Sequence, residues 1–318
     1  MGKDIILAGR TIKRGEKFQD FITIPGTEYR TPVTVINGEG EGKTVLISAG
    51  VHGGEYPGVA SASVVSSQLE PSGVRGAVIF FNCLNYSGMM SMVDAHVPED
   101  DKNINRAFPG SADGSVTERI KYWVANEVRP QVDFILDLHS GGQFETLSDL
   151  IFFPTACGEQ MRELTLDISR HMDVNYLVAS TARDGLYSYS CHQGTPGIIL
   201  ERSGHGECSK KSIEQGINDI NNLLIYFGIT EGSFIPVERE QKIFERTNYL
   251  TSDEAGFWYP EVQIDEDIDK GQKLGTIKDV FGNMLREYHA EFDATVIYMQ
   301  GGLIAQKGKT NLVSYSER

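Results

Sequence analysis

The chain has 318 residues, of which 40% are hydrophobic, and its formal net charge is −15 at pH 7. This length suits one large domain and one small one, and the negative charge argues against a general role on nucleic acids or at membrane surfaces. No apolar run reaches transmembrane length, and the first residues, "MGKDIILAGRTIKRGEKF", lack the apolar stretch of a signal peptide, so we expect a cytoplasmic protein whose partner is a small molecule, alone or as a homo-oligomer.

Strand and helix patterns alternate over the first 230 residues. Short runs of nearly continuous hydrophobicity predict strands that are covered on both faces. These strands are expected at 44–50, 77–85, 133–141, 150–156, 175–180 and 197–204. Helices are expected between them, near 56–69, 115–129, 158–172 and 209–227. The repetition predicts a three-layer α/β/α sandwich around a mixed sheet, with residues 10–36 added as hairpins at the sheet edge.

The pattern changes after residue 230, and residues 231–318 predict a small all-β domain whose short strands are broken by turn signals. Residues 256–299 resemble the hammerhead of lipoyl and biotinyl carriers, which present a modifiable lysine at a hairpin tip. The turn that corresponds to this tip is "EFDAT" (291–295), which has no lysine. We therefore expect no tethered cofactor, and we predict domains at 1–230 and 231–318.

The four cysteines are widely scattered and form no C-x-x-C pair. They favour neither a disulfide framework nor a zinc-thiolate cluster, and they are best interpreted as small hydrophobic residues. They are Cys83, Cys157, Cys191 and Cys208.

Two of the predicted strands end in polar side chains. His52 and Glu55 follow the first strand, and His139 ends the third, in each case next to glycines. Ligands gather outside the carboxyl ends of strands in open α/β sheets, and two histidines with a carboxylate form a zinc set that leaves a fourth position for water. A loop with a stray imidazole is the alternative, which H-x-x-E alone does not exclude. Asp137 shares a strand face with His139, where it can orient that histidine or stabilise the sheet end.

A third segment, "DKNINRAFPGS" (101–111), places Asn105 and Arg106 together in a loop. An arginine fork matches a carboxylate through two hydrogen bonds, and a neighbouring amide adds another; a solvated surface arginine is the alternative. The order H-x-x-E, N-R-x-F-P-G and D-L-H-x-G-G resembles that of the succinylglutamate desuccinylase/aspartoacylase family, a branch of the zinc-carboxypeptidase-like enzymes. The resemblance covers essentially the whole chain, including the small β domain.

The resemblance implies a role for each of these residues. It assigns one Zn²⁺ per chain to His52, Glu55 and His139. It also makes Asn105 and Arg106 the residues that bind the carboxylate of the substrate.

The resemblance further makes Glu201, at the end of the strand in "GTPGIILERSG", the general base and acid. A carboxylate at the end of an apolar strand is independently unusual, because buried charge is costly unless it is paired or used. Arg202 is expected on the opposite face of the sheet, since side chains alternate along a strand. Glu207 is the rival, but it lies past "SGHG" and off the strand.

The chain departs from the family pattern at one position. Many relatives carry an arginine about eleven residues before the N-R arginine, where it helps to stabilise the oxyanion. That position is Ala95 in this chain, with His96 next to it, and no arginine occurs between Arg75 and Arg106. Either His96 or another group donates to the oxyanion, or zinc stabilises it with less help.

The resemblance implies a zinc-dependent hydrolase that cleaves the amide bond of an N-acylated amino acid or a similar small amide that carries a carboxylate. Two alternatives stay open. One is a metallocarboxypeptidase that acts on small peptides, since a carboxylate clamp serves both uses. The other is a catalytically silent relative that binds a small carboxylate or a partner.

Overall fold

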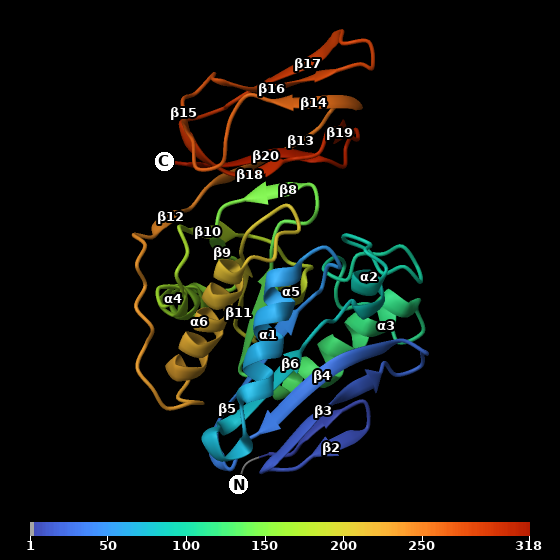
Figure 1. Cartoon of the computed structure of the whole chain (residues 1–318), viewed down its shortest axis with the longest axis vertical. Coiled ribbons are helices and arrows are strands. Elements are labelled where there is room, and N and C mark those ends of the chain that lie inside the picture. The colour runs from blue at the N-terminus through green and yellow to red at the C-terminus, as the bar shows by residue number, and fades with distance from the viewer. Residues whose placement is uncertain (1–2) are drawn as a thin grey trace.

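The computed structural model describes residues 3–318, and its largest element is a mixed nine-stranded sheet (Figure 1). Five of its eight strand pairings are parallel and three are antiparallel. The strand order is β12 (Lys242–Phe244), β10 (Tyr176–Ser180), β9 (Leu150–Pro154), β11 (Gly197–Glu201), β7 (Phe134–His139), β5 (Gly40–Ala49), β6 (Arg75–Phe81), β4 (Arg30–Asn37) and β3 (Glu16–Thr23). The predicted strands are confirmed, and β3 and β4 form the expected edge hairpin.

Helices cover both faces of this sheet. One apolar cluster joins it to α1 (Tyr56–Gln68), α4 (Glu159–Ser169) and α6 (Lys210–Tyr226). A second cluster joins the other face to α3 (Val116–Trp123), the π-helical turn η2 (Val124–Val128), the start of α5 (Leu186–His192), and the hairpin of β1 (Ile5–Leu7) and β2 (Arg10–Ile12). The three-layer sandwich is therefore confirmed. Within residues 3–318, no helix has the length and apolar character that crossing a membrane requires.

The sequence of β5 shows why both faces are covered. Val45 and Ile47 point into the cluster with α1 and α6, whereas Leu46 between them points into the cluster with α3. All three side chains are fully buried. A strand with apolar residues on both faces has to lie between two layers, because neither face can be left to water.

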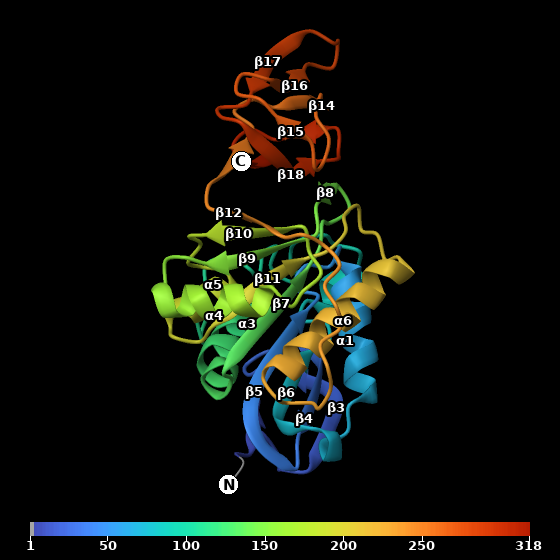
Figure 2. The same ribbon diagram turned by 90° about the vertical axis from the view of Figure 1, so that its left-hand side faces the viewer.

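The C-terminal strands form two further antiparallel sheets with an apolar core of their own (Figure 2). One contains β13 (Thr247–Thr251), β20 (Asn311–Glu317), β18 (Ala294–Gln300) and β15 (Asp267–Ile268). The other contains β17 (Met284–His289), β16 (Lys273–Lys278), β14 (Gly256–Pro260) and β19 (Ile304–Ala305). The predicted small all-β architecture of this region is confirmed.

Two strands connect these sheets to the larger body. β12 lies after residue 230 in the sequence but pairs with β10 in the nine-stranded sheet. β8 (Glu145–Leu147) lies in the first part of the chain but pairs with β18. The boundary at residues 230 and 231 stays a prediction, and β8 ties the C-terminal strands to a loop that follows β7.

The predicted hairpin tip at 291–295 is wrong. This turn joins β17 to β18, and these two strands belong to different sheets. The hairpin of the region is formed by β16 and β17, and its tip is residues 279–283, "DVFGN". The observed tip also has no lysine. We therefore still expect no cofactor to be tethered there.

Arg202 joins β11 to its surroundings on the face away from Glu201, as predicted. Its guanidinium lies 2.5 Å from the carboxylate of Asp219 on α6 and 3.1 Å from that of Asp149. Arg202 and Asp219 are both almost fully buried. A buried charge needs its partner, because the interior cannot replace the lost hydration.

We expect Asp219→Ala to lower the free energy of unfolding by about 3–5 kcal/mol, because it leaves the Arg202 guanidinium buried without its closest partner. Glu214→Ala is the matched control on the same helix, since Lys210 is the one ionic partner of Glu214 among residues 3–318 and both side chains are mostly exposed. The control should change the free energy of unfolding by less than about 1 kcal/mol. Denaturant unfolding measures both, and equal effects would contradict this interpretation.

Candidate active site and metal centre

The candidate site lies where three neighbouring parallel strands end. β11, β7 and β5 are adjacent in the sheet and run in the same direction, so their carboxyl ends meet at one edge. His139 is the last residue of β7, and Glu201, the last residue of β11, is its partner in register. His52 follows the end of β5, and Glu55 is the N-cap residue of α1. The sheet therefore places all four side chains at the same edge.

The turn between β5 and α1 depends on a glycine. Gly50 has a φ of +62°, and a Cβ atom there would lie 2.8 Å from Sγ of Cys83. Both the conformation and the space therefore favour glycine. Pro57 lies in the first turn of α1, a position that suits proline and fixes where the helix begins. The chain thus turns sharply after β5 and places His52 and Glu55 three residues apart in a short loop.

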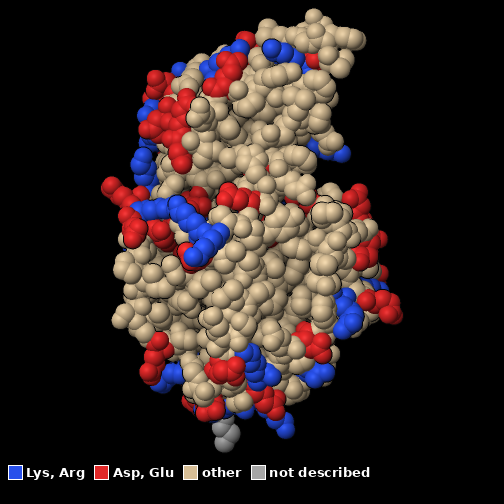
Figure 3. All heavy atoms as spheres, in the orientation of Figure 1, with Lys and Arg blue, Asp and Glu red and all other residues tan. Residues whose placement is uncertain are grey.

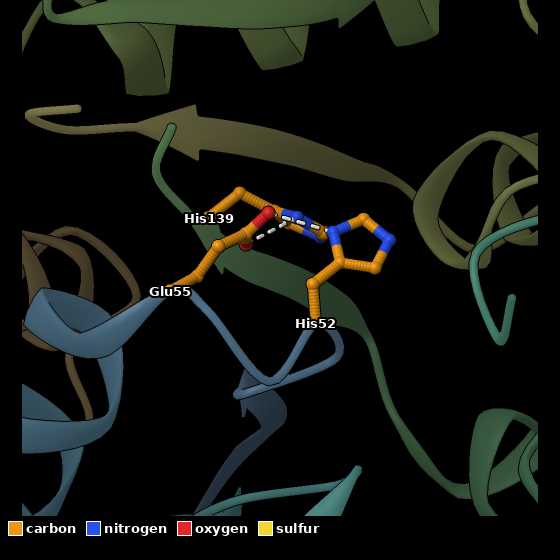
Figure 4. A group of neighbouring side chains, drawn as sticks. All are labelled: His52, Glu55 and His139. Atoms are coloured by element: carbon orange, nitrogen blue, oxygen red, sulfur yellow. Dashed lines mark hydrogen bonds and ion pairs between the residues drawn. The ribbon is translucent and has the colours of Figure 1, made fainter. Parts of the chain in front are cut away.

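The carboxylate of Glu55 lies between two imidazoles (Figure 4). Its Oε1 is 2.7 Å from Nδ1 of His52, and its Oε2 is 2.9 Å from Nδ1 of His139. The side chains are 7% exposed for Glu55, 13% for His52 and 2% for His139. One ligand atom from each lies within 4.8 Å of the others, and within residues 3–318 no other group of three such side chains meets this condition.

These contacts shift the ionisation of the group. Burial alone would raise the pKa of Glu55, but the two imidazoles outweigh it and hold the pKa at about 2. Burial would likewise lower the pKa of His139, but the negative charges of Glu55 and Asp137 raise it well above its ordinary value. The carboxylate is therefore anionic, and the cluster attracts positive charge to its centre.

The two imidazoles are also held on their far sides. Nε2 of His52 lies 3.1 Å from Oδ1 of Asn103. Nε2 of His139 lies 3.2 Å from Oδ2 of Asp137, an ion-pair distance without hydrogen-bond alignment. The same nitrogen is 3.5 Å from Nδ2 of Asn105. Such outer partners fix the ring orientation and leave the Nδ1 atoms facing the same point.

The donor set fits a zinc ion. Two imidazole nitrogens and a carboxylate oxygen are three of the four ligands that zinc takes in catalytic sites, where the fourth position stays open to water or substrate. The Nδ1 atoms of His52 and His139 and the carboxylate of Glu55 all face one another. A metal would bind the lone pair of each Nδ1 atom, so both Nδ1 atoms have to be unprotonated and two metal bonds would replace the two contacts with Glu55.

Glu201 lies beside this cluster with an unused oxygen. Its Oε2 atom is buried and has no hydrogen-bond partner in the described chain. Burial raises the pKa of Glu201 to about 8, and although His139 opposes the rise, the negative charges around it add to it. These charges belong to Glu55, Glu145 and Asp137. A carboxyl group with its pKa near neutrality can both accept and release a proton at physiological pH.

Glu207, the rival glutamate, lies elsewhere. It is exposed, and its side chain pairs with the hydroxyl of Ser203. It does not line the cavity that contains Glu201.

Asn105 and Arg106 lie in the same cavity but differ in burial. Asn105 is buried, and its Oδ1 accepts a hydrogen bond of 2.7 Å from the backbone N–H of Leu186 at the start of α5. Arg106 is exposed, and its Nη1 donates to the carbonyl of Asn105 at 2.8 Å. The buried ammonium of Lys121 donates to the backbone carbonyls of Arg106 and Ala107, which holds the loop in place. Among residues 3–318, no carboxylate forms an ion pair with Arg106, so its guanidinium is free to bind a ligand.

All six predicted site residues line one cavity of about 830 Å³. One side of the cavity comes from the C-terminal strands and the loops between them, a contribution that sequence reasoning missed. The residues from this region include Tyr249, Tyr298, Gln300, Lys309, Thr310 and Asn311.

The C-terminal region also holds the loop that follows His139. The hydroxyl of Tyr298 on β18 donates to Oε1 of Glu145 at 2.9 Å, and the backbone N–H of Gly142 donates to Oε2 of the same carboxylate at 3.0 Å. The pairing of β8 with β18 continues this connection. The strand at one wall of the cavity is therefore bonded to the loop that directly follows a candidate metal ligand, His139.

Ala95 lines the cavity, but its neighbour His96 does not. The His96 ring is half-exposed and lies 2.9 Å from the carboxylate of Asp101. His192 and His205 also lie outside the cavity lining. Among residues 3–318, Arg106 and Lys309 are the basic side chains that line this cavity. No second arginine therefore takes the place of the family arginine that is absent at Ala95.

Comparison with known proteins places this geometry in a family. The succinylglutamate desuccinylase/aspartoacylase catalytic domain matches residues 41–227. An N-α-acetyl-L-2,4-diaminobutyric acid deacetylase from Halomonas elongata is 31% identical over 278 residues, which is 83% of this chain and 79% of that protein.

Solved structures show the same fold over nearly the whole chain. The product-bound ectoine utilization protein of Ruegeria pomeroyi superposes with a TM-score of 0.87 at 22% identity and covers 99% of this chain and 98% of its own. A succinylglutamate desuccinylase/aspartoacylase from Rhodobacter sphaeroides superposes with a TM-score of 0.80 at 23% identity, over 91% and 90% of the two chains. The protein described here belongs to the succinylglutamate desuccinylase/aspartoacylase family.

Proposed function

We propose that this protein is a zinc-dependent deacylase that hydrolyses the amide bond of an N-acylated amino acid. The observation that carries the proposal is a single cavity with two binding elements. It contains the His52–Glu55–His139 group and Arg106, which forms no ion pair within residues 3–318. The first element suits a zinc ion, and the second suits the carboxylate of an amino acid. Membership of the family and the name of the Halomonas elongata relative support a deacylase.

Each of these cavity residues has a separate role in hydrolysis. When bound, zinc polarises the amide carbonyl and lowers the pKa of water. Arg106 binds the substrate carboxylate, with Asn105 beside it, and so fixes the amide relative to Glu201. Oε2 of Glu201 accepts a proton from the attacking water as the new C–O bond forms, and it then delivers that proton to the nitrogen of the breaking C–N bond. The products are a carboxylic acid and a free amino acid.

The acetyl derivative of a small amino acid is the first substrate to assay, since the Halomonas elongata relative is named for such a compound. Dipeptides of similar size provide the comparison that separates a deacylase from a carboxypeptidase. Release of amine from the acetyl compound, abolished by a chelator and restored by zinc, is the expected result.

The purified protein should hold about one zinc ion per chain, because three ligands of the right kind converge at one point. His52→Ala and His139→Ala should each empty the site. His289→Ala is the control, since His289 is an exposed histidine in the C-terminal region. Elemental analysis after dialysis measures all four proteins. Zinc retained by both site variants, or absent from a wild-type protein supplied with zinc, would contradict the assignment.

Arg106→Ala should raise KM by about 10- to 100-fold, which is the loss expected for a charge-assisted hydrogen bond of about 1.5–3 kcal/mol. Zinc content should not change, since Arg106 does not contact the histidines. Arg106→Lys should recover only part of the binding, because an ammonium group cannot reproduce the planar fork. Full recovery with lysine, or equal hydrolysis of acetyl amides that lack a carboxylate, would show that Arg106 has another role.

Glu201→Gln should lower kcat by about 10²- to 10⁴-fold, the usual contribution of a positioned acid–base group. KM and zinc content should change little, because the ligands and the carboxylate clamp remain. Glu207→Gln is the matched control and should be nearly silent. Loss of zinc from Glu201→Gln would show that Glu201 is a metal ligand. A larger fall in kcat for Glu207→Gln than for Glu201→Gln would show that Glu207 is the general base.

The same Glu201→Gln variant should be more stable than the wild type when both lack metal. The pKa of Glu201 is about 8 in the fold and 4.5 ordinarily, so between these pH values the folded state keeps a proton that the unfolded state has lost. The stability of the wild type therefore falls as the pH rises through this interval, by up to about 1.4 kcal/mol per pH unit, whereas glutamine does not titrate. Thermal unfolding from pH 5 to 8.5 measures the difference, and a difference that does not grow with pH would argue against the raised pKa.

A further inference from the structure

Asp94 lies between the loop that contains His52 and Glu55 and the loop that follows His139. Its backbone carbonyl accepts a hydrogen bond of 3.1 Å from the N–H of Gly54, and its Oδ1 accepts one of 3.4 Å from the N–H of Gln143. Gly54 directly precedes Glu55, and Gln143 lies four residues after His139. The carboxylate is therefore held against both loops, at the wall of the cavity.

Two glycines make room for this carboxylate. A Cβ atom on Gly54 would lie 1.9 Å from Oδ1 of Asp94, and one on Gly142 would lie 2.4 Å from the same atom. Both distances are shorter than any non-bonded contact, so a larger residue at either position would displace the carboxylate. The local sequence thus positions Asp94 by close packing as well as by hydrogen bonds.

Asp94 has no cationic partner within residues 3–318. The other carboxylates of the cavity have their own contacts: Glu55 lies between the imidazoles, Glu145 accepts from Tyr298, and Asp184 accepts from the N–H of Ala107. Oδ2 of Asp94, by contrast, accepts no hydrogen bond from the described residues. Partial burial raises the pKa of Asp94. An unpaired carboxylate in a partly buried position is costly, and a cationic ligand would offset that cost.

The charges that line the cavity also favour one charge on the side chain of the substrate. Five carboxylates line it, against one arginine and one lysine. Arg106 is assigned to the carboxylate of the substrate under the proposed function, on which this inference rests. A second carboxylate on the substrate would meet repulsion, whereas a positive group would be attracted. The face of the molecule shown in Figure 3 carries both acidic and basic side chains, so this preference rests on the residues that line the cavity.

We propose that Asp94 is a specificity-determining residue that binds an ammonium group on the side chain of the substrate, so that the preferred substrates are N-acylated diamino acids. Oδ2 of Asp94 accepts hydrogen bonds from the ammonium, while Oδ1 stays bonded to Gln143. The substrate is then fixed at two charged ends, its carboxylate at Arg106 and its ammonium at Asp94. The amide lies between these ends, next to the candidate metal ligands.

Three acetyl amino acids, two with side chains of the same size and one with a longer acidic side chain, test this assignment with zinc-loaded enzyme. The side chain is cationic in N-α-acetyl-2,4-diaminobutyrate, neutral and of the same shape in N-acetylnorvaline, and anionic in N-acetylglutamate. The wild type should favour the cationic compound over the neutral one in kcat/KM by about 10- to 100-fold, the range of a charge-assisted contact. Asp94→Asn keeps the bond to Gln143 and should remove most of this preference, with little change on N-acetylnorvaline.

Glu99→Gln is the matched control, since Glu99 is an exposed carboxylate in the same loop and outside the cavity. It removes the same charge and should leave the preference intact. An unchanged preference in Asp94→Asn, or an equal loss on all three compounds, would overturn the assignment; an equal loss would mean that Asp94 acts on the metal site instead.

Calorimetric titration separates this inference from the proposed function, because it needs no turnover. Free 2,4-diaminobutyrate should bind the wild type more tightly than norvaline, and Asp94→Asn should abolish the difference. If none of the acetyl compounds is hydrolysed but this difference is present, the proposed deacylase fails and the ammonium site stands. Equal binding of the two amino acids by the wild type would overturn the ammonium site.

Discussion

The bridge that the Glu55 carboxylate forms between His52 and His139 is the interaction on which the site depends. The two imidazoles come from the ends of different strands, and Glu55 comes from the first residue before a helix. Only the adjacency of β5 and β7 in the parallel part of the sheet brings them within reach. The bridge holds two imidazole nitrogens and one negatively charged carboxylate close together, and these are three ligands of the kind that zinc takes in catalytic sites.

The rest of the cavity is built around this centre in two parts. The α/β body supplies Glu201, in register with His139, and the loop of Arg106, which the buried Lys121 holds in place. The C-terminal strands supply another wall and bond to the loop after His139 through Tyr298. These strands are therefore part of the candidate site. Changes in this region should alter what the cavity binds without touching the metal ligands.

The sequence is informative where chemistry follows directly from strand ends. The expected positions of His52 and His139 needed only the apolar runs that precede them and the rule that parallel strands end at one edge, whereas Glu201 was chosen mainly through the resemblance to the family. The contacts of Asn103 and Asp94 could not be predicted in the same way, because each depends on how two loops that are distant in sequence pack together. The predicted position of the hairpin tip at 291–295 was wrong for a related reason. Long-range pairing decides which strands share a sheet, and local turn signals do not encode that pairing. Tyr298 and the β8 pairing, which join segments about 150 residues apart, belong to the same class.

The proposed function depends most on one zinc ion bound by His52, Glu55 and His139. Anomalous diffraction at the zinc absorption edge, from crystals of the zinc-loaded 318-residue chain, would locate this ion. We expect one strong anomalous peak per chain, in contact with Nδ1 of His52, Nδ1 of His139 and a carboxylate oxygen of Glu55, and none elsewhere in the cavity. A peak that contacts other side chains, or no peak at this position in crystals that contain zinc, would contradict this assignment.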